Sequence, residues 1–129
     1  MNCQYMLITG GRQYRGLAQM RVHLQFAKDK CVSTGRDLVV IHGGAAGADS
    51  IAERVARELE IPTQVFPADW EQHGRSAGFK RNEVMARCLL EMEQIGDEVC
   101  VVAFPGASGT QHMRHTAKKM GLKVYAPHA

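Results

Sequence analysis

Three glycine-rich segments of this chain carry hydroxyl or charged side chains, and each follows a short apolar run. They contain Gly10, Gly11 and Arg12 after residues 5–9; Gly43, Gly44, Gly47 and Asp49 after residues 38–42; and Pro105, Gly106, Ser108, Gly109 and Thr110 after residues 98–104. Glycine lets the backbone approach a ligand closely. Two of the segments run directly into predicted helices, whose free N–H groups attract anions. Two such loops near arginines favour a phosphate or nucleotide site over turns that merely ease the chain into a helix.

Basic residues precede or open a predicted helix in the segment 73–85. Arg75, Lys80 and Arg81 stand where cations oppose the helix dipole. A solvated charge run is the ordinary explanation of such a pattern, but an anionic ligand would remove the conflict with the dipole. We therefore expect Arg75 and Arg81, together with Arg12, to pair with the charge of a phosphate.

Two acidic residues near these loops are candidates for binding a ribose or for catalysis. Asp49 opens a predicted helix, where it interacts with the helix dipole, accepts a ribose hydroxyl or orders the glycine loop before it, and the sequence leaves these roles open. Asp69 follows a predicted strand and is the second candidate for a ribose hydroxyl. Its neighbour Trp70 either covers the edge of the core or stacks on a base, and the position at the core edge is slightly favoured.

Motifs for common cofactors and metals are absent from the sequence. There is no G-x-x-x-x-G-K-[ST] and no C-x-x-C pair, and the first strand–helix turn reads GGRQYRG instead of G-x-G-x-x-G. His112 and His115 stand three residues apart on a predicted helix, but no third metal ligand accompanies them. We interpret both as solvated residues of the helix face, and we expect no metal site and no resident cofactor.

The elements that must position these residues alternate along the chain. Short segments predict strands at 5–9, 38–42, 63–66, 98–104 and 122–126, and the segment 38–42 is a continuous apolar run of the kind that a strand buried on both faces requires. Apolar residues at helical spacing predict helices at 15–33, 48–60, 78–93 and 109–120, with a loop at 67–77. Strands joined through helices run parallel and connect right-handedly. The sequence therefore predicts an α/β fold, a three-layer Rossmann-like sandwich with a parallel five-stranded sheet, and a ligand site at the carboxyl ends of the strands.

Length and composition agree with one small domain over residues 1–129. Of the 129 residues, 45% are hydrophobic and 22% charged, which is ordinary for a globular domain and argues against disorder or a coiled coil. No apolar run approaches the roughly 20 residues of a membrane helix, and the N-terminal residues carry no export signal. The four cysteines are scattered and fit a reducing environment, so we expect a cytoplasmic protein with no membrane partner.

The net charge of +3 is too small to argue for nucleic acid by itself. No acid follows Glu98, so the C-terminal third, with Arg114, Lys118, Lys119 and Lys123, is locally positive. Such a region suits an anionic small ligand at least as well as nucleic acid. Proteins that bind DNA strands or grooves are usually more basic and richer in aromatic platforms than a chain with one tryptophan. We therefore do not expect nucleic acid as the partner.

Several motifs, in one order, resemble those of a known group of proteins. GGAAGAD at 43–49, FPADW at 66–70, the pair Arg81-Asn82 and PGASGT at 105–110 are similar to motifs of the SLOG superfamily, and more closely to its small stand-alone YspA/YpsA-related members of bacteria and phages. The similarity spans essentially the whole chain. It implies a Rossmann-like fold, a nucleotide or ADP-ribose-like ligand, and contacts to phosphate and ribose from the two glycine loops. It also implies assembly as a dimer or larger homo-oligomer.

The superfamily includes the LOG-type phosphoribohydrolases, which cleave the N-glycosidic bond of a nucleoside monophosphate. The resemblance matches Arg81 to their catalytic arginine, but Met113 stands at the position of their glutamate. A methionine can neither stabilise an oxocarbenium-like centre nor activate water. Our first hypothesis is therefore binding or sensing of a phosphorylated nucleoside derivative. The alternatives are a nucleotide N-glycosidase that uses Asp69 or Asp49 with Arg81, and a DNA-processing protein.

Overall fold

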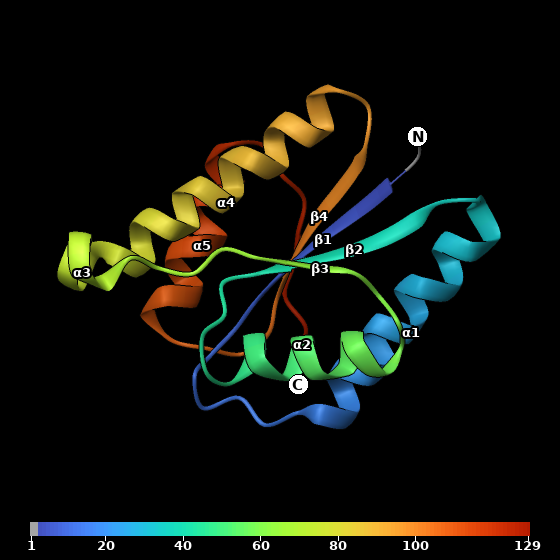
Figure 1. The fold of residues 1–129 in the computed structure, drawn as a ribbon, viewed down its shortest axis with the longest axis horizontal. Coiled ribbons are helices and arrows are strands. Elements are labelled where there is room, and N and C mark those ends of the chain that lie inside the picture. Colours follow the sequence, from blue (N-terminus) through green and yellow to red (C-terminus); the bar gives the residue numbers. More distant parts are fainter. Residues whose placement is uncertain (1–2) are drawn as a thin grey trace.

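The computed structural model describes residues 3–129, which form a parallel sheet between two layers of helices (Figure 1). The strands are β1 (Cys3–Thr9), β2 (Asp37–His42), β3 (Thr63–Val65), β4 (Glu98–Ala103) and β5 (Val124–Tyr125). The order across the sheet is β3-β2-β1-β4-β5, and every pairing among the described strands is parallel. The predicted α/β Rossmann-like fold with a five-stranded parallel sheet is thus confirmed.

Four long helices cover the two faces of the sheet. α1 (Leu17–Thr34) and α2 (Ala48–Glu58) lie on one face, and α4 (Ala77–Gln94) and α5 (Ser108–Lys119) lie on the other (Figure 1). Each helix follows a strand and returns the chain to the start of the next one. As a result, the carboxyl ends of the strands and the N-termini of these helices gather at one edge of the sheet.

Two apolar clusters, one on each face of the sheet, hold the layers together. Successive residues of β1 point to opposite faces of the sheet. Ile8 belongs to the cluster under α1 and α2, whereas Leu7 belongs to the cluster under α4 and α5. Both side chains are fully buried, which explains why the sequence shows a continuous apolar run instead of alternation. Burial of each such side chain contributes about 1.5–3 kcal/mol, and the clusters thereby fix the strand ends that carry the loops.

The segment 67–77 is not a loop throughout, contrary to the prediction. It contains the short helix α3 (Trp70–His73) and the 3-10 turn η1 (Gly74–Ser76), which leads directly into α4. The helix begins at Trp70 because Oδ1 of Asp69 accepts a hydrogen bond from the backbone N–H of Gln72 at 3.0 Å. A helix of four residues carries no periodic pattern that a sequence could reveal.

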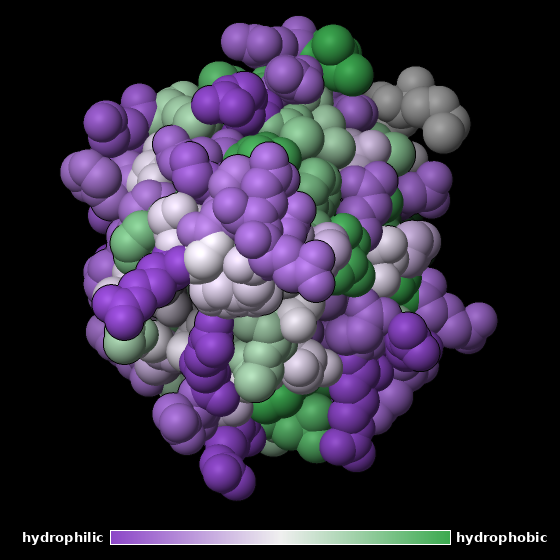
Figure 2. Space-filling view, turned by 60° about the vertical axis from the view of Figure 1, so that its left-hand side comes forward, coloured by the Kyte–Doolittle hydropathy of each residue, from purple (hydrophilic) through white to green (hydrophobic). Residues whose placement is uncertain are grey.

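The surface near α3 is mostly hydrophilic. Figure 2 turns that side of the molecule forward and shows polar residues with smaller hydrophobic areas among them. Each helix within residues 3–129 is too short or too polar to span a lipid bilayer.

Candidate functional site

A cavity of about 350 Å³ lies where β1 and β4 end. In the sheet, β2 and β3 lie on one side of β1, and β4 and β5 lie on the other side. The direction in which strands are added therefore reverses between β1 and β4. Such a switch point is the usual ligand site of a doubly wound sheet. The predicted site residues that line the cavity are Gly10, Gly11, Arg12, Asp49, Trp70, Arg75, Arg81, Asn82, Ser108, Gly109 and Thr110.

The remaining predicted residues lie close by but not on the cavity wall. They are Gly43, Gly44, Gly47, Asp69, Pro105 and Gly106. Asp69 instead lines a neighbouring depression of about 260 Å³. The two carboxylates considered for catalysis thus line different spaces, and Arg81 lines both. Only Asp49 shares the cavity with Arg81.

The N-terminus of α5 presents unpaired backbone donors to the cavity. Ala107, which precedes the helix, provides no side-chain cap. The N–H of Gln111 donates to the carbonyl of Ala107 at 3.0 Å, but no acceptor within residues 3–129 serves the N–H groups of Ser108, Gly109 and Thr110. These three residues line the cavity. Free N–H groups at the positive end of a helix dipole form a favourable position for an anion.

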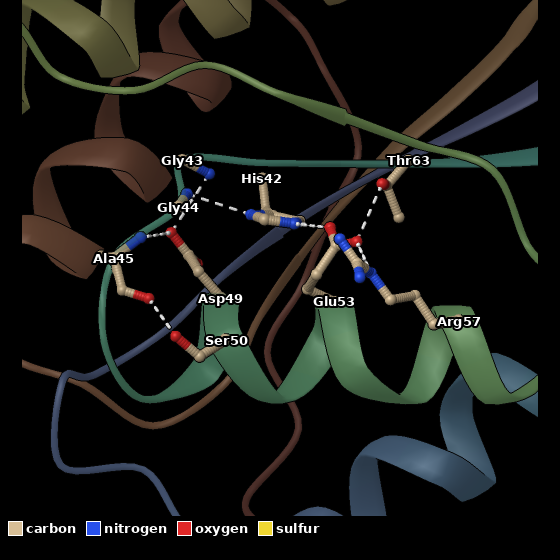
Figure 3. Close-up of polar contacts among 9 residues, drawn as sticks. All are labelled: His42, Gly43, Gly44, Ala45, Asp49, Ser50, Glu53, Arg57 and Thr63. Carbon is tan, nitrogen blue, oxygen red and sulfur yellow. Dashed lines mark hydrogen bonds and ion pairs between the residues drawn. The ribbon is translucent and has the colours of Figure 1, made fainter.

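The loop after β2 is turned inward, and its backbone donors are already used (Figure 3). Oδ2 of Asp49 accepts the N–H of Gly43 at 3.1 Å and that of Ala45 at 3.2 Å. Nδ1 of His42 accepts the N–H of Gly44 at 3.0 Å. Of the roles left open for Asp49, the structure shows the ordering of this loop. Burial raises the pKa of Asp49, while the hydrogen bond from the Ala45 N–H opposes the rise.

A buried histidine connects the same loop to α2. A backbone N–H only donates, so His42 accepts on Nδ1 and carries its proton on Nε2, which donates to Oε1 of Glu53 at 2.7 Å (Figure 3). Oε2 of Glu53 accepts from Nε of Arg57 at 2.7 Å and from Oγ1 of Thr63 at 3.3 Å. The hydrogen bond from Arg57 above all, and then that from His42, lower the pKa of Glu53 to about 2.

Arg81 and Asn82 link the loops that follow β2 and β4. Nη1 of Arg81 donates to the carbonyl of Gly43 at 2.6 Å, and its Nε donates to Oδ1 of Asn82 at 3.0 Å. Asn82 is buried, and its Nδ2 donates to the carbonyl of Gly109 at 3.2 Å. Burial lowers the pKa of Arg81, and the nearby Asp49 carboxylate opposes this shift. The Arg81 guanidinium therefore has two roles. It donates hydrogen bonds that hold the loops together, and it places a positive charge on the cavity wall.

Two glycines leave space that neighbouring groups fill, and at one of them, Gly47, the backbone requires glycine. The space that a Cβ would take at Gly43 is occupied by the guanidinium of Arg81. At Gly47, where φ is +80°, that space is occupied by the backbone of the loop after β1. In that loop, Gly11 donates its N–H to the carbonyl of Pro105 at 2.9 Å. These glycines join the three loops to one another.

The charges on the cavity wall are mostly positive. Arg12, Arg75 and Arg81 line it, whereas Asp49 is the only acidic side chain among the lining residues. Arg12 and Arg75 are exposed, and the ion pairs found within residues 3–129 include neither of them. A negatively charged ligand would therefore find two guanidinium groups that form no ion pair with a carboxylate of the described residues.

Trp70 lies on the cavity wall and not at the edge of the core, so the favoured prediction for it is wrong. Its side chain is 51% exposed. The guanidinium of Arg12 lies 5.7 Å from the centroid of the Trp70 ring, which is within reach of a cation–π interaction. The unpredicted helix α3 places the ring there.

The sequence prediction missed several lining residues, namely Thr9, Ala45, Gly78, Phe79 and Ala107. Phe79 is the most informative, because its ring stacks on His112 with centroids 4.3 Å apart and planes 17° apart. The interpretation of His112 as a solvated residue is therefore wrong, whereas His115 is exposed. The available signal was an aromatic residue close to Arg81 in the first turn of a helix, which a search for polar groups overlooks.

Position 113 contributes no group to the cavity. Met113 is fully buried in the apolar cluster under α4 and α5. The position that the resemblance matches to the LOG-type glutamate therefore places no carboxylate on the cavity wall.

The fold is similar to that of a larger solved protein. The crystal structure of MurG from Acinetobacter baumannii matches 98% of this chain with a TM-score of 0.52 and 13% sequence identity. This chain spans only 34% of the MurG chain. At such low identity the likeness concerns the Rossmann-type fold alone.

Comparison of sequences identifies the family. Gene 61 protein of Mycobacterium phage D29 is 38% identical over 126 residues, which cover 92% of each chain. A model of the YspA, cpYpsA-related SLOG family matches residues 5–73, which include β1, β2 and β3 and the inward-turned glycine loop after β2. The chain therefore belongs to the YspA, cpYpsA-related SLOG family.

Proposed function

We propose that this chain binds a nucleotide or a nucleotide-derived ligand, such as an ADP-ribose-like molecule, with a phosphate on the N-terminus of α5. The unpaired N–H groups of residues 108–110 carry the proposal, because they share one cavity with three arginines and a single carboxylate. The guanidinium groups of Arg12 and Arg75 would pair with the phosphate, and Asp49 would meet a ribose hydroxyl. Membership in the SLOG family suggests nucleotide-related binding or processing and supports this ligand class.

Binding without cleavage is the form of this function that we favour. The buried Met113 supplies no carboxylate, and Oδ2 of Asp49 already accepts two backbone N–H groups. Hydrolysis of an N-glycosidic bond is the second candidate, because Asp49 and Arg81 line the same cavity.

Calorimetric titration with AMP, ADP, ADP-ribose and inorganic phosphate tests the proposal. We expect Arg12→Ala to weaken binding about tenfold, because a charge-assisted hydrogen bond contributes about 1.5–3 kcal/mol and water screens an exposed arginine. Arg15→Ala is the matched control, since Arg15 is an exposed arginine of the same segment that does not line the cavity. Equal effects of the two substitutions, or no heat of binding with any compound, would contradict the proposal.

Chromatography of the same samples separates binding from processing. We expect each nucleotide to be recovered intact. Release of the base by the wild-type chain, abolished in Asp49→Asn, would favour the hydrolase. DNA binding that falls steeply with salt would favour the DNA-processing alternative. We further propose that the chain is a single cytoplasmic domain that assembles as a homo-oligomer, which size-exclusion chromatography tests.

A further inference from the structure

Phe79 presents an aromatic surface to the cavity that the core does not explain. The side chain is 43% exposed and lines the cavity, and it belongs to neither apolar cluster of the sheet. His112 covers one face of its ring in a nearly parallel stack. The contact with His112 thus leaves a large part of the Phe79 side chain accessible.

Contacts through His112 and Asn82 connect this ring to the N-terminus of α5. Nδ2 of Asn82 lies 3.3 Å from Nδ1 of His112 and donates to the carbonyl of Gly109 at 3.2 Å. Since an amide NH₂ only donates, His112 accepts on Nδ1 and its imidazole is held in one orientation. Asn82 thus connects the support of Phe79 to a residue whose own N–H is unpaired. A ligand that places an anion on α5 therefore has an aromatic side chain on the wall of the same cavity.

Trp70 is the other exposed aromatic residue of the cavity, and its ring lies beside both an arginine and a helix. The Arg12 guanidinium lies over it, and a Cβ added at Gly78 would lie 3.9 Å from the Trp70 ring, so the ring packs beside the start of α4. Phe79 is therefore the aromatic surface better placed to take a planar group.

We infer that Phe79 is the surface on which the base of the ligand stacks, with His112 as the layer behind it. The inference rests on the proposed function and narrows its ligand to a nucleoside phosphate, in preference to a sugar phosphate that lacks a base. Stacking accepts any planar base, since every base offers a π face to an aromatic ring.

Calorimetry with AMP, UMP and ADP-ribose, and with ribose 5-phosphate as the comparator without a base, tests this inference. We expect the wild-type chain to bind its preferred nucleotide at least about tenfold more tightly than ribose 5-phosphate. Phe79→Leu removes the ring and keeps apolar bulk, so it should remove most of this preference and leave the affinity for ribose 5-phosphate unchanged. Phe79→Tyr keeps the ring and should keep the preference.

Phe26→Leu is the control, because Phe26 is an exposed phenylalanine on α1 that does not line the cavity. Equal affinity for ribose 5-phosphate and the nucleotides, weakened by Arg12→Ala, would overturn this inference and leave the proposed function standing. Equal weakening of all ligands by Phe79→Leu, with an unchanged melting temperature, would overturn it as well. Failure of all four compounds to bind would overturn the proposed function and this inference together.

Discussion

Asp49 determines the direction in which the backbone N–H groups of the glycine loop after β2 point. Its carboxylate takes the N–H groups of Gly43 and Ala45, and His42 takes that of Gly44, so three successive donors point into the protein. The glycine content of this loop predicts an anion cradle, but it carries no information on where the N–H groups point. That direction depends on acceptors that the sequence does not identify as partners. A phosphate contact from Gly43, Gly44 or Gly47 stays a prediction.

Glu53 is expected to make the fold sensitive to acid. Its pKa of about 2 lies below the ordinary 4.5, so its charge contributes stability that is fully present above pH 4.5 and is lost as the pH falls through 2. Between about pH 6 and about pH 2.5, we expect the wild type to lose about 1–2 kcal/mol more unfolding free energy than Glu53→Gln, a discounted value because water screens the exposed Arg57.

Urea unfolding at the two pH values measures this difference. Glu93→Gln, an exposed carboxylate of α4 without an ion pair within residues 3–129, is the control and should behave as the wild type. If Glu53→Gln loses as much stability as the wild type, Glu53 does not contribute in this way.

The strands and long helices were predictable because their patterns extend over many residues. A parallel strand buried on both faces gives a continuous apolar run, as in β4, and a helix packed on a sheet gives apolar residues at helical spacing, as in α2. The helix α3 was not predictable, because it has four residues and depends on one hydrogen bond from Gln72 to Asp69. For that reason the position of Trp70 was missed.

Gly78 leaves space in the cavity, but a glycine lowers the stability of α4. It lies in the first turn of the helix and on the cavity wall. We expect Gly78→Ala to stabilise the fold by up to about 1 kcal/mol. We also expect it to weaken nucleotide binding severalfold, because the new methyl group would lie against the Trp70 ring and the Arg81 guanidinium.

Thermal unfolding and calorimetry measure the two effects of Gly78→Ala. Val32→Ala on the exposed surface of α1 is the control, because it also raises helix propensity but lies away from the cavity. Unchanged nucleotide affinity in Gly78→Ala would show that this part of the wall does not contact the ligand.

The parallel sheet as a whole brings three loops, distant in sequence, to one edge. Gly11 joins them directly, since its N–H donates to the carbonyl of Pro105 and its carbonyl accepts from the N–H of Ala48 at 3.1 Å. The meeting of the loops follows from the predicted topology, because parallel strands end together. Which of the three loops can bind an anion does not follow from the topology, because it depends on which backbone N–H groups the folded chain leaves unpaired. Within residues 3–129, the N–H groups of Ser108, Gly109 and Thr110 at the start of α5 are left unpaired on the cavity wall.

Whether a phosphate binds at the N-terminus of α5 is tested most directly by the amide spectrum of ¹⁵N-labelled protein during titration with AMP. We expect the amide resonances of Ser108, Gly109 and Thr110 to shift most, because no acceptor within residues 3–129 serves their N–H groups. The resonances of Gly43 and Gly44 should change little, because their N–H groups already donate to Asp49 and His42. Largest shifts at Gly43 and Gly44, with residues 108–110 unaffected, would contradict the assignment of the anion site to α5.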